Sequence, residues 1–204
     1  MKKTQIIFSM ILTTFLLAVC MTIPICAEDT VKSGAWGDLS WMLDETTGEL
    51  VIWGEGEMNS LVDTPVWRTY SSSIKTVVIR EGVKSIGNYA FEGCKSFTEL
   101  TIPDNVTSIG NYSFRECSSL KILTIGSGVK SIGKDAFHLC GLEKIYCLAP
   151  TPPSLGSSNV FHNSPSVVKI YVPASEDDSV INAYKSASVW SSYAGRIYVI
   201  GTEE

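Results

Sequence analysis

The sequence predicts a solenoid built mainly from short parallel β-strands, with turns or short helices between them and a different structure closing each end. Ser-Ile-Gly, phenylalanine and cysteine recur with a period of 23 residues, and the aligned positions are Ile86, Ile109 and Ile132, then Phe91, Phe114 and Phe137, then Cys94, Cys117 and Cys140. A unit of this length cannot bury its own apolar face and therefore stacks on copies of itself. Between these positions, apolar and polar residues alternate, which is typical of short strands with one buried side.

Residues 1–27 are predicted to be an export signal. Two lysines begin the segment, an apolar run covers residues 6–19, and Ala27 offers a small residue ahead of a cleavage site. The run is short for a membrane span, which needs about 20 apolar residues. We expect cleavage after Ala27, while lipidation of Cys20 and retention as an uncleaved anchor are the alternatives. The mature chain is then secreted or held at the cell surface.

The mature chain is expected to be acidic. Removal of residues 1–27 leaves 177 of 204 residues and changes the formal charge from −5 to −7, because two lysines and no acid leave with the signal. An acidic exported chain argues against nucleic acid and against anionic membrane surfaces as partners. The sequence after the signal has no second apolar run that would predict a membrane span.

Residues 28–73 do not match the repeat and are predicted to form a β-rich N-terminal cap. Two short strands at 39–43 and 50–53 flank a turn at 44–48. The end of a solenoid exposes apolar surface, so an atypical unit is needed to cover it. Large side chains suit such a lid, and a ligand platform is the alternative reading of the four tryptophans concentrated here: Trp36, Trp41, Trp53 and Trp67.

Residues 74–173 are predicted to form the repeats. Each unit has a strand with two inward residues, and the pairs are Val77 and Ile79, Leu100 and Ile102, Leu123 and Ile125, Ile145 and Cys147, and Ile170 and Val172. A further inward residue precedes each strand: Ile74, Phe97, Leu120, Leu142 and Val167. Three strands are followed by a Ser-Ile-Gly turn, whose glycines are expected where a side chain would obstruct the backbone: Gly87, Gly110 and Gly133.

Residues 174–204 are predicted to form a C-terminal cap made of a helix and a strand. Apolar residues at helical spacing occur within 176–186, and Asp177 and Asp178 lie near the start, where negative charge suits a helix N-terminus. Residues 196–200 read as the final strand.

Four cysteines lie outside the predicted signal: Cys94, Cys117, Cys140 and Cys147. Disulfides are one interpretation for an exported chain. Three of the four occupy one repeat position, where a small apolar side chain fills the core, and the Cβ vectors of a stacked ladder run parallel. We therefore expect a reduced, buried ladder.

The pattern Leu-x-x-Leu-x-Ile-Pro-x-x-Val-x-x-Ile-Gly-x-x-x-Phe-x-x-Cys covers Phe97 to Cys117, with phenylalanine in the first position. It resembles the BspA-type leucine-rich repeats of bacterial surface proteins. Residues 37–58 look like the module that often precedes these repeats, and residues 171–197 look like the one that follows them. The resemblance implies a leucine-rich-repeat solenoid and a role in surface display, adhesion or contact between bacteria. It brings no shared catalytic residues.

Two motifs that suggest chemistry are explained better by the repeat. Residues 128–134 come close to a phosphate-binding loop, but Asp135 stands where a serine or threonine would hold magnesium. The histidines, His138 and His162, each follow a repeat phenylalanine in a variable position that is expected to face solvent, and no third metal ligand is evident. We therefore predict no enzyme activity, no cofactor and no metal.

The outward side of the strands is the strongest candidate for a binding surface. Residues that alternate with the inward ones point out of the sheet, and tyrosine is enriched at binding surfaces. Ordinary strand propensity is the alternative explanation for threonine and tyrosine in this row. The residues chosen as candidates for partner binding are Thr101, Thr124, Tyr146, Tyr171, Lys144 and Lys169. The proline-rich loop 148–159 is the second choice.

The predicted function is an exported, non-catalytic module that binds a protein or peptide at the bacterial cell surface. The first alternative is glycan binding through exposed aromatic residues that include Trp36 or Trp53. The second is a structural or oligomerising element.

Overall fold

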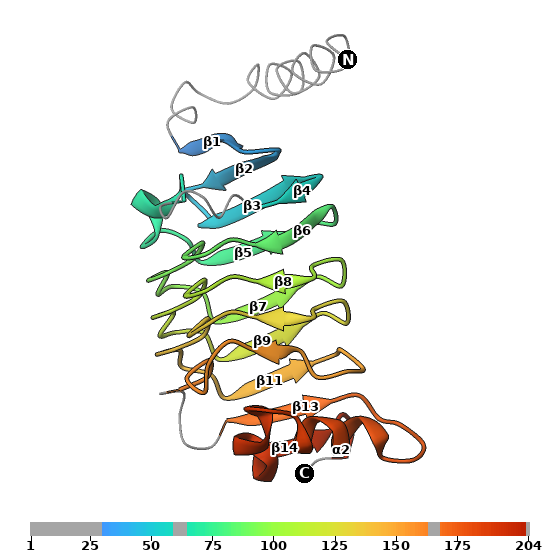
Figure 1. Ribbon diagram of the computed structural model, residues 1–204. Coiled ribbons are helices and arrows are strands. Elements are labelled where there is room, and N and C mark those ends of the chain that lie inside the picture. The colour runs from blue at the N-terminus through green and yellow to red at the C-terminus, as the bar shows by residue number, and fades with distance from the viewer. Residues whose placement is uncertain (1–29, 59–64, 163–167, 203–204) are drawn as a thin grey trace.

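A computed structural model of the protein describes residues 30–58, 65–162 and 168–202. The predicted export signal, with Cys20, and the predicted inward residue Val167 lie outside these residues. The described chain forms an elongated stack of short strands that begins at β1 and ends at a small helical cap (Figure 1). The predicted solenoid is therefore confirmed.

Two sheets share one side of the solenoid. One is a four-stranded sheet with the order β1-β2-β3-β5, and the other is a five-stranded sheet with the order β7-β9-β11-β13-β14. The bounds of the first are Val31–Trp36, Leu39–Asp44, Glu49–Gly54 and Thr76–Ile79. Those of the second are Glu99–Ile102, Ile122–Ile125, Lys144–Cys147, Lys169–Val172 and Ile197–Val199. The outward surface of these two sheets is called the strand face below.

A third sheet, with the order β4-β6-β8-β10-β12, was not predicted from the sequence. Its strands are Gly56–Glu57, Val83–Ile86, Ser108–Ile109, Ser131–Ile132 and Ser154–Leu155. The Ser-Ile dipeptides that we expected to form turns instead pair in parallel register, with Ser108 between Ser85 and Ser131. Strands of two residues are too short to show an alternating pattern, so the sequence does not distinguish them from turns.

Two of the three predicted glycines, Gly110 and Gly133, lie where a side chain would obstruct the backbone, whereas a Cβ atom on Gly87 would meet the side chains of Trp36 and Met58 at 3.2 and 3.3 Å. A Cβ atom on Gly110 would lie 2.6 Å from the Asn88 nitrogen, and one on Gly133 would lie 2.5 Å from the Asn111 nitrogen. Gly156 repeats this geometry one unit later, with 2.5 Å to the Lys134 nitrogen. Only glycine lets consecutive turns approach so closely.

Five aromatic rings form the centre of the core. The rings of Trp67, Phe91, Phe114, Phe137 and Phe161 stack in that order, with centroid separations of 5.7, 4.9, 5.1 and 5.8 Å. Trp190 then packs on Phe161 at 5.8 Å in a tilted arrangement. Aromatic pairs at such distances stabilise the core beyond the area that they bury.

The N-terminal end is closed by tryptophans, as the lid interpretation predicts. Trp36 packs edge-on against Trp67 with ring centroids 4.8 Å apart, and Trp41 lies 6.1 Å from Trp67. All three are buried, whereas Trp53 is half-buried. The two predicted strands appear as β2 and β3, and an additional strand, β1, pairs antiparallel with β2.

The C-terminal end is closed by helix α2 (Ser179–Ser186), the 3₁₀ segment η2 (Trp190–Arg196) and strand β14 (Figure 1). Helix α2 begins three residues later than predicted, and the Asp177 carboxylate accepts a hydrogen bond from the Ser179 amide at 3.0 Å. This cap also fixes the proline-rich loop 148–159. Its three contacts are Tyr184 Oη to Ala149 O at 2.8 Å, Trp190 Nε1 to Pro153 O at 2.6 Å, and Tyr193 Oη to Ser158 O at 3.1 Å.

The four cysteines of the described chain are free and buried, which confirms the predicted reduced ladder. The thiols of Cys117 and Cys140 donate to the carbonyls of Phe91 and Phe114 at 3.2 and 3.1 Å. Burial raises the pKa of the Cys94 thiol to about 12. The Cys94 thiol is therefore a structural group of the core, because the reactive form of cysteine is the thiolate.

Candidate functional site

A central row of outward residues crosses the strand face from one end to the other. The paired residues of adjacent strands define this row, which contains Met42, Val51 and Val78 in the first sheet, and Thr101, Thr124, Tyr146, Tyr171 and Tyr198 in the second. The row is apolar near the N-terminal cap, carries hydroxyls in the middle and ends in three tyrosines. Stacking of the repeats thus divides the row into an apolar part, a threonine part and a tyrosine part.

Four of the six candidate binding residues lie in this central row, and three of them are accessible. Thr101 is exposed, and Thr124 and Tyr146 are half-buried. Tyr171 does not match the expectation of a solvent-facing side chain, because only 3% of it is exposed. Its ring is enclosed between Tyr146, at a centroid distance of 5.0 Å, and Tyr198, at 6.0 Å.

Sequence reasoning missed Tyr198 as a site residue. It belongs to β14, outside the 23-residue repeat, but it pairs directly with Tyr171 and remains half-buried. The signal that could have found it is the Ile-Tyr-Val sequence, which β13 and β14 share. The accessible tyrosines of the face are therefore Tyr146 and Tyr198, and Tyr171 supports both.

A second outward row carries the charges of the strand face. Its register runs through Asp44, Glu49, Thr76, Glu99, Ile122, Lys144 and Lys169. The acidic residues belong to the N-terminal half of the row, and the two lysines to its C-terminal end. Lys144 and Lys169 are exposed neighbours on adjacent strands, and the Lys169 ammonium lies 5.9 Å from the centre of the Tyr198 ring. A lysine over a tyrosine face is a favourable cation–π arrangement.

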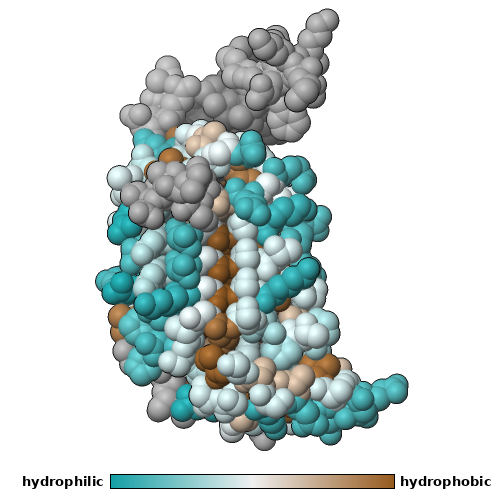
Figure 2. All heavy atoms as spheres, viewed as in Figure 1, coloured by the Kyte–Doolittle hydropathy of each residue, from teal (hydrophilic) through white to brown (hydrophobic). Residues whose placement is uncertain are grey.

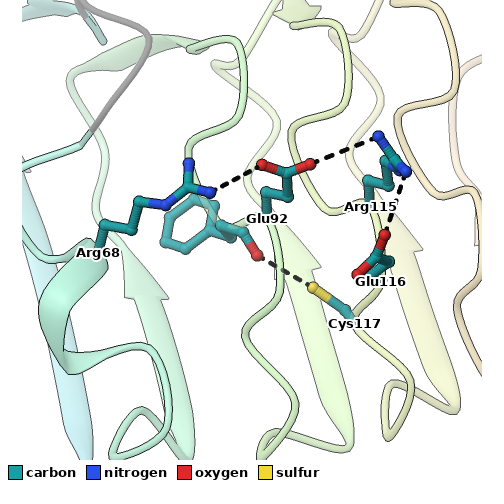
Figure 3. Close-up of polar contacts among 6 residues, drawn as sticks. Arg68, Glu92, Arg115, Glu116 and Cys117 are labelled. Carbon is teal, nitrogen blue, oxygen red and sulfur yellow. Dashed lines mark hydrogen bonds and ion pairs between the residues drawn. The ribbon is translucent and has the colours of Figure 1, made fainter.

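A different ridge holds an ordered set of charges. The position after each core ring carries Arg68, Glu92, Arg115, His138 and His162 in successive units. Glu92 contacts Arg68 at 3.3 Å and Arg115 at 3.7 Å, and Arg115 also contacts Glu116 at 3.1 Å (Figure 3). The ion pairs among Arg68, Glu92, Arg115 and Glu116 partly neutralise the charge of this ridge.

The two histidines continue the same ridge. Their rings stack with centroids 5.8 Å apart and planes 13° apart, and His162 is exposed while His138 is half-buried. Within residues 30–58, 65–162 and 168–202, no three residues among histidine, cysteine, aspartate and glutamate come together as metal ligands.

The segment that resembles a phosphate loop is part of the solenoid backbone. Its amides donate to the preceding unit: Lys130 N to Thr107 O at 2.8 Å, Gly133 N to Ile109 O at 2.7 Å, and Lys134 N to Asn111 Oδ1 at 2.7 Å. A phosphate loop needs its amides directed at the ligand. In this segment those amides hold adjacent units together.

The surface agrees with a repeat protein that displays columns of like residues. Figure 2 shows, on one side of the described chain, a narrow apolar column along the solenoid axis, flanked by pale and hydrophilic residues. None of the helices in the described part of the chain has the length and apolar character that a membrane crossing requires. The fold and the accessible rows define a repeat solenoid of the kind that presents a surface to other molecules.

Comparisons with known proteins identify the repeat. The family described as the BspA type leucine-rich repeat region matches residues 69–188, with six copies of the repeat. The match covers more than half of the chain, and the protein therefore belongs to this family. Membership identifies the solenoid as one built from leucine-rich repeats.

A solved structure shows the same fold. The chain is similar to a leucine-rich repeat protein from Eubacterium ventriosum, with a TM-score of 0.53 and 20% sequence identity over 72% of this chain and 45% of that one. The chain thus spans less than half the length of this neighbour. No curated protein matches the sequence.

Proposed function

We propose that the protein is an exported, non-catalytic module that recognises a protein or peptide at the bacterial cell surface through its strand face. Residues 28–73 and 174–204 serve as caps, and residues 74–173 supply the repeats that carry the face. The observation that carries the proposal is the Tyr–Lys platform, which consists of Tyr146, Tyr198, Lys144 and Lys169.

The arrangement of the two lysines favours a binding role. Lys144 and Lys169 are direct neighbours on adjacent parallel strands. Like charges at such positions repel each other and destabilise a sheet. An anionic partner that lies against both ammonium groups would offset this repulsion on binding.

The tyrosines beside the lysines supply contact area. Tyr146 stacks on Tyr171, which in turn packs against Tyr198, so the two accessible rings are held by a buried one. Rigid aromatic side chains lose little conformational entropy on binding and are enriched at interface hot spots. The platform therefore suits an acidic protein segment that also presents apolar groups.

One of the two tryptophans suggested for glycan binding, Trp36, is buried. Trp36 is 4% exposed and packs against Trp67 inside the N-terminal cap, so it is not accessible to a ligand. The threonines and tyrosines of the central row are spread along several strands, which suits an extended polypeptide. They do not surround a single site of the size of one sugar ring.

The test uses matched charge changes on two faces. A partner is first captured by the mature protein from bacterial and host surface extracts, and its affinity is then measured by biolayer interferometry. The Lys144→Ala/Lys169→Ala protein should bind at least tenfold more weakly, and Tyr146→Ala/Tyr198→Ala should do the same. Lys84→Ala/Lys130→Ala removes two exposed lysines from the third sheet and its edge and should bind normally. Equal affinity in all variants would contradict the proposal.

Export is tested separately. Mass spectrometry of the mature N-terminus should find Glu28 as the first residue, after cleavage at Ala27. A lipid on Cys20, or an intact segment 1–27, would contradict this part of the proposal.

A further inference from the structure

Strand β1 forms the open edge of the strand face at the N-terminal end of the solenoid (Figure 1). It has six residues and, among the strands of the described chain, pairs with β2 alone. The antiparallel register is unbroken, from Val31 opposite Asp44 to Trp36 opposite Leu39. The other side of β1 is therefore a regular strand edge without a neighbouring strand in the described residues.

The hydrogen bonds of β1 show which backbone groups lie on this open edge. The Glu45 amide donates to the Thr30 carbonyl at 2.7 Å, and the register places these two residues opposite each other as a hydrogen-bonded pair. Backbone groups alternate in direction along an antiparallel strand, so every second residue, starting with Lys32, bonds to β2. The residues that direct their amide and carbonyl groups to the open edge are Val31, Ser33 and Ala35.

The edge lacks the features that keep strand edges from pairing with other chains. Proteins usually protect an edge with a short strand, a bulge, a proline or an exposed charge. The other strands that face the two ends of the solenoid are short, since β14 has three residues and β4 and β12 have two each. β1 has neither a proline nor a break in register, and its charged residue, Lys32, lies 3.6 Å from Glu45 of its own chain.

Exposed apolar side chains lie beside this edge. Val31 is 41% exposed, and Met42, opposite Ser33 on β2, is 37% exposed. They are two of the four large apolar side chains that are exposed in the described chain. Because side chains alternate along a strand, Val31, Ser33 and Ala35 lie on the same outward surface as Met42. A strand added at the edge would therefore cover apolar surface as well as bond to the backbone.

We infer that two copies of the protein pair through β1, antiparallel to each other, about a two-fold axis between their Ser33 residues. Val31 then lies opposite Ala35 of the second copy, and Ser33 lies opposite Ser33 of the second copy, as hydrogen-bonded pairs of one continuous sheet. A two-fold contact uses the same edge on both copies, so the assembly closes as a dimer. The partner that fits this edge is a second copy of the chain.

The sequence of β1 is self-complementary in this register. Lys32 lies opposite Gly34 of the second copy, whose missing side chain leaves room for the lysine stem. A side chain on Gly34 would also be obstructed within its own chain, because a Cβ atom there would lie 3.0 Å from Trp41 Nε1. The two copies of Lys32 are offset along the strands, so no like charges lie directly opposite each other.

The dimer edge is separate from the Tyr–Lys platform. β1 lies at one end of the strand face, whereas the platform belongs to β11, β13 and β14 at the other end. Self-association needs no ligand, so dimerisation and partner binding are tested independently and either can fail alone. The pairing is smaller than a standard interface of about 1,600 Å², so we expect a dissociation constant in the micromolar range.

Cysteine substitution tests the register directly. In Ser33→Cys the two new thiols would face each other on Cα atoms about 5.5 Å apart, within the range for a disulfide. The mature variant should therefore form a covalent dimer on mild oxidation, seen by non-reducing electrophoresis. Val31→Cys is the matched control, because its two copies would lie roughly 14 Å apart and should not crosslink. The natural cysteines of the described chain are buried and do not compete.

Proline substitution tests the main-chain bonds. Ser33→Pro removes an N–H that points to the open edge and keeps the bonds to β2, so the variant should fold with an unchanged circular dichroism spectrum. Sedimentation velocity over a series of concentrations should show a wild-type dimer and association at least about tenfold weaker in Ser33→Pro.

Val199→Pro is the control at the other end of the solenoid. Ile200 N donates to Val172 O, so the amide of Val199 faces the free edge of β14, and this variant should associate like the wild type. The inference is overturned if the wild-type protein stays monomeric, if Ser33→Pro associates normally, or if Val31→Cys crosslinks as readily as Ser33→Cys. An equal loss of association in Val199→Pro would also overturn it.

Discussion

The indole ring of Trp67 stacks on the phenyl ring of Phe91, with centroids 5.7 Å apart and planes 25° apart. The indole Nε1 also donates to the carbonyl of Ala90 at 2.8 Å. Trp67 lies 24 residues before Phe91, so it occupies the ring position of the first unit. A single side chain thus begins the core ladder and joins the N-terminal cap to the repeats.

We expect the ladder to be most sensitive at its centre. Phe114→Ala should lower the free energy of unfolding by about 3–5 kcal/mol, because the cavity lies between two fully buried rings. Trp67→Phe keeps a ring in the stack but leaves the Ala90 carbonyl without its donor, so it should cost about 1–3 kcal/mol. Urea unfolding monitored by circular dichroism measures both, and an equal loss in the two variants would contradict the ranking.

Neighbouring tyrosines of the strand face should respond differently to truncation. Tyr171→Ala removes a ring that is 3% exposed and enclosed between two others, so it should cost several kcal/mol of stability, roughly 3. Tyr146→Ala should cost about 1 kcal/mol, since the ring is only half-buried. Thermal unfolding of both variants checks this, and a stable Tyr171→Ala protein would show that the ring is not enclosed.

The repeat made much of this fold predictable, because a position such as Phe114 has copies one period away on both sides. Inward pairs such as Leu123 and Ile125 recur in the same way, and so do the obstructing glycines. The third sheet could not be predicted, since Ser108 and Ile109 form a strand of only two residues. Local pattern cannot separate such a strand from a turn.

The candidate site was less predictable than the fold. Burial of Tyr171 depends on Tyr198, which lies outside the repeat and is brought alongside by the C-terminal cap. The strand face is interrupted between β5 and β7, which belong to different sheets, and Pro103 directly after β7 has no N–H to donate to the preceding unit. Yet Pro173 has the same chemistry, and β13 still pairs with β11 over three residues. Tertiary packing therefore decides whether a missing donor opens the face.

Backbone conformation should make Gly93 sensitive to substitution. Its φ is +72°, in the left-handed region, although a Cβ atom there would have no neighbour within 4 Å. Gly93→Ala should therefore cost about 1 kcal/mol through backbone strain alone. Gly195 has the same open surroundings without a positive φ, so Gly195→Ala should be neutral or slightly stabilising. Equal effects on the midpoint of urea unfolding would contradict this reasoning.

The charged ridge should contribute little to stability. Glu92 contacts Arg68 and Arg115, but the arginine side chains are 45% and 36% exposed (Figure 3). Exposed ion pairs are worth about 0–1 kcal/mol and are screened by salt. Glu92→Gln should therefore cost less than about 1 kcal/mol at low ionic strength, and less still in 1 M salt. A larger loss that persists in salt would indicate a packing role for Glu92.

Alkaline pH should destabilise the protein through its buried thiols. Burial raises the pKa of Cys94 from 9.0 to about 12 and that of Cys147 to about 11, so the folded state holds these protons more tightly than the unfolded state does. Their contribution is complete below pH 9.0 and is lost as the pH rises toward 11 and 12. Each thiol adds a slope of up to about 1.4 kcal/mol per pH unit in this window. Urea unfolding with a reductant measures the slope, and Cys94→Ala should reduce it without changing the slope at neutral pH. An unchanged alkaline slope in that variant would show that the Cys94 thiolate is tolerated in the folded core.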